Sequence, residues 1–191
     1  MTISIQKAQV MKMRVISGSA RGRKLSTPED KAIRPTTDNV KESIFNIIQF
    51  DIEGRRVLDL FAGTGQLGIE CLSRGAKSAV FIDQSPQAVK IVKDNLRSLG
   101  LQGTVLRQDS LAYLRSAPQF DLIFIDPPYE AGMYAPALEI INSVDILSDG
   151  GIMICESQRD ERLPELSAPY KKGREYRYGK VKLTLYTKEK L

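Results

Sequence analysis

The sequence contains no histidine, and only two of its 191 residues are cysteines. The absence of histidine excludes Ser-His and Cys-His nucleophiles, so any general base must be a carboxylate, a lysine or a tyrosine. Cys71 and Cys155 lie inside apolar segments without ligand-like spacing. We therefore expect no disulfide framework and no metal site.

Long apolar runs are also missing. No run reaches the roughly 18 residues that span a bilayer, and the amino-terminal stretch lacks the apolar core of a signal peptide. We therefore expect a cytoplasmic protein without a membrane segment. The length, with 42% hydrophobic and 27% charged residues, suits one ordinary domain with a small appendage.

The charge is concentrated at the two ends of the chain. Residues 1–34 carry eight basic side chains against two acidic ones, residues 171–191 again carry eight against two, and the stretch between them carries 12 against 19. An acidic core with basic ends is typical of a nucleic-acid-binding protein. The alternative is that lysine-rich ends only keep the protein in solution.

The segment Asp126-Pro127-Pro128-Tyr129 follows a short apolar run, residues 120–125, that predicts a buried strand. Two prolines cannot supply ladder donors, so the strand ends there and Asp126 falls at its carboxyl edge, where open α/β sheets bind ligands. The turn offers acceptors, namely the Asp126 carboxylate and a peptide oxygen, to the two N–H donors of a planar amino group. Tyr129 can stack on a base. The alternative is a plain proline turn with a surface tyrosine.

Glycines at 63, 65 and 68 form a G-x-G-x-x-G turn between a predicted strand, residues 56–60, and a predicted helix. This spacing lets the backbone approach a nucleotide-like ligand at a helix amino terminus, although the pattern alone is weak. A second strand, residues 79–83, ends in Asp83, which is suited to accept hydrogen bonds from two ribose hydroxyls.

Asp59 distinguishes between two ligands for this turn. A carboxylate just before the glycines repels a pyrophosphate, whereas it attracts the cationic methionine moiety of S-adenosylmethionine. The sequence therefore favours S-adenosylmethionine over a dinucleotide. Asp59 taken by itself can also be an acid that only caps its turn.

The remaining pattern alternates strands and helices, which predicts a doubly wound, mainly parallel α/β sheet. Residues 104–110 predict a further strand and turn, residues 151–156 predict another strand, and an antiparallel hairpin at 174–187 closes the sheet edge. Breaks at Gly18 and Gly22 in an alternating basic segment indicate a short hairpin near the amino end. Asp109 lies in the strand-and-turn segment 104–110, where it either meets an adenine edge with Ser110 or caps the next helix.

These motifs resemble class I S-adenosylmethionine-dependent amino-methyltransferases. The segments Arg14-Val15-Ile16-Ser17-Gly18, Arg21-Gly22-Arg23-Lys24-Leu25 and Arg34-Pro35-Thr36-Thr37-Asp38 through Asn46 resemble, more closely, the RsmD-type guanine-N2 methyltransferases of small-subunit ribosomal RNA. The resemblance covers residues 13–187. It implies a Rossmann-like fold with a basic RNA-contacting extension, residues 1–36, before a methyltransferase domain, residues 37–191.

The resemblance also implies roles for individual residues. The catalytic set is Asp126, Pro127, Pro128 and Tyr129. The RNA-binding set is Arg14, Arg21, Arg23, Lys24 and Arg34. The residues that bind S-adenosylmethionine are Asp59, Phe61, Ala62, Gly63, Thr64, Gly65, Gly68, Asp83, Gln84, Ser85, Gln108, Asp109 and Ser110.

The expected function is methyl transfer to the exocyclic N2 amine of a guanine in 16S ribosomal RNA, by a monomer that acts on the RNA or on the assembled small subunit. One alternative is an adenine-N6 methyltransferase, which is disfavoured on DNA because no segment is spare enough to form a target-recognition domain. The other is a non-catalytic RNA-binding assembly factor. The intact glycines, Asp59 and Asp126 argue against it.

Overall fold

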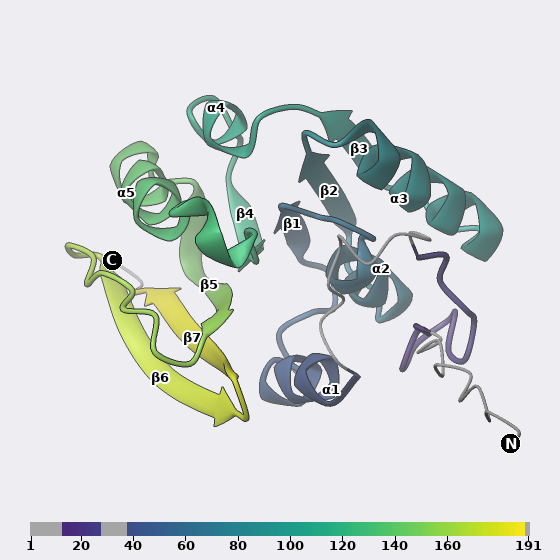
Figure 1. Cartoon of the computed structure of the whole chain (residues 1–191), viewed down its shortest axis with the longest axis horizontal. Coiled ribbons are helices and arrows are strands. Elements are labelled where there is room, and N and C mark those ends of the chain that lie inside the picture. Colours follow the sequence, from purple (N-terminus) through teal and green to yellow (C-terminus); the bar gives the residue numbers. More distant parts are fainter. Residues whose placement is uncertain (1–12, 28–37, 190–191) are drawn as a thin grey trace, which may run out of the picture.

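The computed structural model describes residues 13–27 and 38–189. In these residues seven strands form one sheet in the order β3-β2-β1-β4-β5-β7-β6 (Figure 1). The pairs among the first five strands of this order are parallel, and β7 pairs antiparallel with both β5 and β6. The strands are β1 Arg56–Leu60, β2 Ser78–Asp83, β3 Thr104–Arg107, β4 Phe120–Ile125, β5 Leu147–Gln158, β6 Tyr170–Tyr178 and β7 Val181–Lys188.

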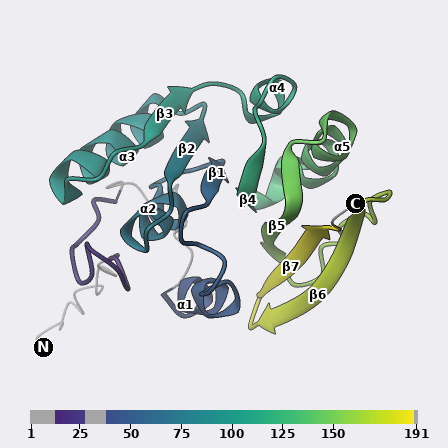
Figure 2. The same cartoon turned by 180° about the vertical axis from the view of Figure 1, so that it is seen from behind.

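Helices cover both faces of this sheet, as the alternating pattern predicted. Helices α1, α2 and α3 pack with one apolar cluster, and α4 and α5 pack with the other (Figures 1 and 2). This arrangement follows from right-handed crossovers that continue on one face from β1 to β3 and on the other from β3 to β5. The helices are α1 Asp38–Ile47, α2 Gln66–Ser73, α3 Pro86–Leu99, α4 Ser110–Leu114 and α5 Tyr134–Val144. The predicted doubly wound, mainly parallel fold is confirmed.

The central strands β1 and β4 are mostly apolar because helices cover both faces of the sheet. In β1 all residues after Arg56 are buried, and in β4 only Asp121 is not. β3 lies at the sheet edge and has no fully buried residue. No helix among the described residues is both long and apolar enough to cross a membrane.

The carboxyl-terminal hairpin β6–β7 is confirmed, but it joins the sheet by its second strand. β7 inserts between β5 and β6, so its residues alternate between the two apolar clusters: Val181 and Leu183 face one, and Tyr186 faces the other. β5 extends four residues before and two residues after the predicted 151–156, because Leu147 pairs with Phe120 of β4 and the ladder with β7 continues to Gln158.

Residues 13–27 form the predicted short hairpin, with Arg14 opposite Lys24 in an antiparallel bridge. The hairpin is fastened to the outside of α2. The Glu70 carboxylate accepts hydrogen bonds from the backbone N–H groups of Ile16 at 2.7 Å and Ser17 at 2.9 Å. The hairpin therefore packs beside α2 and α3, away from β4 and β5 (Figure 2).

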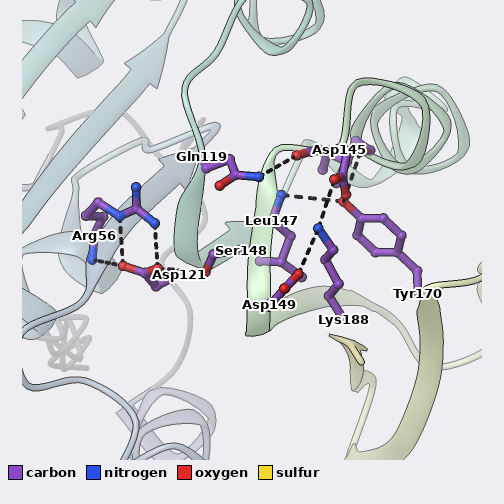
Figure 3. A network of polar contacts seen from close by, with 10 residues as sticks. Arg56, Gln119, Asp121, Asp145, Leu147, Ser148, Asp149, Tyr170 and Lys188 are labelled. Atoms are coloured by element: carbon purple, nitrogen blue, oxygen red, sulfur yellow. Dashed lines mark hydrogen bonds and ion pairs between the residues drawn. The ribbon is translucent and has the colours of Figure 1, made fainter. Parts of the chain in front are cut away.

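A polar clamp joins three strands at the edge where the parallel strands begin (Figure 3). Asp121 of β4 accepts from the side chain of Arg56 at 2.8 and 3.0 Å, from its backbone N–H at 2.8 Å, and from Ser148 Oγ at 2.6 Å. The hydrogen bond to Arg56 lowers the pKa of Asp121 well below its usual range. The clamp thus keeps Asp121 charged at the edge opposite the site described next.

Candidate active site

A cavity of about 510 Å³ opens where the parallel strands end. This is the edge at which the loops of an open α/β sheet form a binding crevice. The cavity receives residues that end or follow β3, β2, β1 and β4, one residue near the end of β5, and the first residue of β7. Its lining residues are Phe61, Ala62, Gly63, Thr64, Gln66, Asp83, Gln84, Ser85, Gln87, Ala88, Asp109, Ser110, Asp126, Pro127, Pro128, Tyr129, Met133, Glu156 and Val181.

The glycine turn is held against β2 by Asp83. One carboxylate oxygen of Asp83 accepts from the Gly63 N–H at 2.9 Å and the other accepts from the Ser85 N–H at 2.8 Å. Each oxygen keeps a second lone pair, and Asp83 lines the cavity, so the carboxylate is available to ribose hydroxyls. Ser85 also caps α3 by accepting from the Ala88 N–H at 3.3 Å.

The three glycines of the turn have different roles. Gly63 has a positive φ and lines the cavity. Gly65 and Gly68 do not line it: a Cβ on Gly65 would lie 3.0 Å from Val92, and one on Gly68 would lie 2.4 Å from Phe81. These two positions are glycine because α2 packs closely on β2 and α3.

Asp59 lies behind the turn and is only 3% exposed. Its carboxylate accepts from the Gly68 N–H in the first turn of α2 at 2.9 Å. Burial raises the pKa of Asp59 to about 7; the Gly68 N–H opposes this shift, and the charge of Asp83 adds to it. Asp59 does not line the cavity.

The loop after β3 carries the remaining residues expected to bind the cofactor. Asp109 caps α4 by accepting from the Ala112 N–H at 2.8 Å, which is one of the two alternatives that the sequence left open, and it also lines the cavity. Ser110 and Gln84 line the cavity as well, whereas Gln108 is exposed outside it. The backbone N–H of Gln108 donates to the Asp83 carbonyl at 3.1 Å, which ties this loop to β2.

All four residues of the Asp126–Tyr129 segment line the cavity at the end of β4. After Pro128 the chain forms one 3-10 turn, Tyr129–Ala131, with the Ala131 N–H donating to the Pro128 carbonyl at 3.0 Å. The buried Tyr134 lies close by. Burial raises the pKa of its hydroxyl, and the charge of Asp126 adds to the shift.

Six lining residues were not predicted from the sequence: Gln66, Gln87, Ala88, Met133, Glu156 and Val181. Glu156 carried the same signal as Asp59 and Asp83, an acid at the end of a predicted strand. Val181 carried none, because its place depends on β7 pairing with β5. Gln66 is 6% exposed, and its Oε1 has no hydrogen-bond partner in the described part of the chain.

The basic residues expected to bind RNA lie apart from the cavity lining. Arg14, Arg21, Arg23 and Lys24 are exposed on the amino-terminal hairpin. Arg23 donates from its guanidinium to the Ser98 carbonyl at the end of α3. Arg34 lies outside the described residues. In the part of the chain that the structure describes, no group of three or more Cys, Asp or Glu residues is arranged to hold a metal ion.

Comparisons with known proteins agree with this fold. Residues 13–187 match the family described as Conserved hypothetical protein 95. The chain is 32% identical to Ribosomal RNA small subunit methyltransferase D of Escherichia coli K12, over 93% of this chain and 90% of that one. It is 35% identical to the protein of the same name from Haemophilus influenzae, over 79% and 81% of the two chains.

A solved structure also resembles the chain, at the level of the fold. It is the Thermus thermophilus 16S rRNA N2 G1207 methyltransferase (RsmC) in complex with AdoMet and guanosine, with a TM-score of 0.71 and 20% identity over 94% of this chain and 50% of that one. The family match covers most of the chain, in agreement with the resemblance of the Arg14–Leu25 and Arg34–Asn46 motifs. The chain therefore belongs to the Conserved hypothetical protein 95 family, the RsmD-type methyltransferases with a Rossmann-like fold.

Proposed function

We propose that this protein transfers a methyl group from S-adenosylmethionine to the exocyclic N2 amine of a guanine in 16S ribosomal RNA. One observation carries the proposal: a single cavity holds both the Asp83-anchored glycine turn and the Asp126–Tyr129 segment. A cofactor in the first part and a base against the second would therefore meet inside one enclosure. The names of the relatives from Escherichia coli and Haemophilus influenzae agree with this activity.

The residues around the turn fit S-adenosylmethionine. Asp83, Asp109, Ser110 and Gly63 all line the cavity. Asp83 would accept from ribose hydroxyls, Asp109 and Ser110 would meet the adenine edge, and the positive φ of Gly63 would let its backbone approach the ligand. The bound cofactor supplies an activated methyl on a sulfonium. Asp59 would act from behind the turn, through the α2 amino terminus that it holds.

The Asp126–Tyr129 segment would orient the acceptor amine. Its nitrogen lone pair is delocalised into the ring, so positioning is the main requirement. The Asp126 carboxylate and the Pro127 carbonyl would accept the two amine hydrogens, while Tyr129 would stack on a base flipped from its helix. As the new N–C bond forms, the S–C bond breaks, and the amine then loses one proton.

The proposal also covers the contacts with RNA and the organisation of the chain. The exposed basic side chains of residues 14–24 would contact RNA phosphates at a distance from the target base, with an affinity that falls as salt rises. We propose a basic extension, residues 1–36, and a methyltransferase domain, residues 37–191, acting as a monomer in the cytoplasm on the small ribosomal subunit or its RNA. An RNA target defined by shape suits a compact protein of this kind.

The Asp126→Ala variant tests the catalytic assignment. We expect it to lose transfer of tritium from labelled S-adenosylmethionine into RNA of a strain lacking the enzyme, while calorimetry shows nearly unchanged cofactor affinity. Asp94→Ala, which removes an exposed carboxylate from α3, is the matched control and should keep both. Equal loss of transfer and affinity would move Asp126 into the cofactor site. If the unmutated protein does not bind S-adenosylmethionine, the proposed methyltransferase activity is refuted.

Nucleoside analysis of the labelled RNA tests the base. N2-methylguanosine is the expected product. Label recovered as N6-methyladenosine would refute the guanine assignment and support the adenine alternative.

A further inference from the structure

The cavity has two parts that follow the order of the strands. Residues at the ends of β1, β2 and β3 are those that fit the cofactor, whereas Asp126 follows β4, Glu156 lies near the end of β5, and Val181 begins β7. Neighbouring strands lie about 4.8 Å apart, so β4 and β5 bring the backbones of Asp126 and Glu156 close together. Glu156 therefore belongs to the part of the cavity that would receive the base.

The Glu156 side chain projects from the face of the sheet that α1 and α2 cover. Glu156 pairs with Leu183 across the antiparallel β5–β7 ladder, so both side chains project to the same face of the sheet. Leu183 belongs to the apolar cluster that contains α1 and α2. Gln66, the first residue of α2, lines the same cavity from that side.

Glu156 is held firmly in this place. It is 5% exposed, and its backbone carbonyl accepts from the Tyr134 hydroxyl at 2.6 Å. The following residue, Ser157, is fully buried. A carboxylate that lines a cavity from a fixed strand is suited to accept a hydrogen bond from a ligand.

The base edge supplies a matching pair of donors. In guanine the ring N1–H lies directly beside the N2 amine, so two acceptors side by side satisfy both. In adenine the ring N1 is an acceptor, and a carboxylate facing it brings two lone pairs together. A second carboxylate beside the one that holds the amine would therefore select guanine.

We infer that Glu156 is a specificity residue, which accepts the N1–H of the target guanine while Asp126 holds its N2 amine. This inference rests on the proposed function. It also assigns Gln66 to the same wall, because this residue lines the cavity and its buried Oε1 has no hydrogen-bond partner among the described residues. The guanine preference is thus built into the end of β5 and is separate from the Asp126–Tyr129 segment.

The test compares two RNA substrates. One is a 16S fragment with guanine at the target position, mapped beforehand by nucleoside analysis, and the other carries 2-aminopurine there, which keeps the N2 amine but replaces N1–H by a lone pair. We expect the unmutated protein to prefer guanine in kcat/KM by about 10- to 100-fold, the range of one well-placed polar contact to a base. Equal use of both substrates would refute the inference without any variant.

Glu156→Gln is the second arm. Its carboxamide can donate to the ring nitrogen, so we expect the preference for guanine to be largely lost while calorimetry shows an unchanged affinity for S-adenosylmethionine. Glu139→Gln, at an exposed position on α5, removes the same charge and should leave the preference intact. A Glu156→Gln protein that binds the cofactor and keeps the full preference would overturn the assignment. If the unmutated protein methylates no guanine, the proposed function itself has failed, which is a different result.

Discussion

The buried carboxyl of Asp59 makes the stability of this protein depend on pH in an unusual direction. In the unfolded chain Asp59 ionises near its ordinary pKa of 3.8, whereas burial raises its folded pKa to about 7. Between these values the unfolded state loses the proton first. The contribution of Asp59 to stability is therefore full below about pH 4 and is lost as the pH rises to 7.

The magnitude follows from the size of the shift. Each pKa unit corresponds to about 1.4 kcal/mol, so the difference between 3.8 and about 7 is on the order of 4 kcal/mol of the free energy of unfolding. Asp59→Asn removes the titration and keeps an oxygen that can accept from the Gly68 N–H. We expect the variant to gain about 4 kcal/mol relative to the unmutated protein between pH 4 and pH 7.5.

Urea denaturation followed by circular dichroism, at several pH values for both proteins, measures this gain. Only the difference between the two curves is interpreted, because the other titrating groups cancel in it. A difference that stays constant from pH 4 to pH 7.5 would mean that Asp59 is ionised throughout and that its burial does not control its charge.

The protonation of Asp59 also tests its proposed connection to the cofactor. If the sulfonium cation of S-adenosylmethionine attracts the Asp59 carboxylate, cofactor binding lowers the pKa of Asp59. Calorimetry at pH 6.5 in buffers of different ionisation enthalpy will then detect a released proton. The Asp59→Asn variant should not release it. Binding without proton release in the unmutated protein would leave Asp59 with a purely structural role behind the glycine turn.

Two further substitutions test the packing and the clamp. Gly68→Ala places a Cβ 2.4 Å from the buried Phe81 ring and should lower the free energy of unfolding, measured by urea denaturation, by about 1–3 kcal/mol. Gly173→Ala is the control, because the atom nearest to its added Cβ lies at 3.4 Å, and it should lower the free energy of unfolding far less. Equal losses for the two variants would contradict the close approach of Gly68 to Phe81. Asp121→Asn weakens the contacts to Arg56 and Ser148 and should cost about 1–3 kcal/mol at pH 7. Because the pKa of Asp121 is lowered, this cost should shrink as the pH falls below about 4, and a cost independent of pH would refute the charged clamp.

The sequence predicted the parallel part of the sheet well because its signals are local. The buried strands β1 and β4 are short, mostly apolar segments, and a glycine turn follows the first and a proline pair the second. The handedness of the crossovers then places Asp59, Asp83 and Asp126 at one edge without further information.

The rest depends on contacts between distant segments. The position of Asp59 behind the turn follows from its hydrogen bond to Gly68, and nothing in the strand pattern distinguishes an acid that faces the cavity from one that faces a helix end. Glu70 looks like an ordinary helix residue, but its side chain is buried under the amino-terminal hairpin, and its partners there are backbone N–H groups that any sequence provides. Val181 reaches the cavity only because β7, rather than β6, joins β5.

The attachment of the amino-terminal hairpin to α2 has a consequence for the order in which the chain is made. The acceptors for Ile16 and Ser17 lie 54 and 53 residues further along, and the Asn95 side chain that receives the Ser26 N–H lies 69 residues further along. During synthesis the basic hairpin therefore leaves the ribosome long before its docking surface exists. This protein would emerge with a positively charged segment free to touch ribosomal RNA, and it would withdraw that segment onto α2 and α3 only as those helices fold.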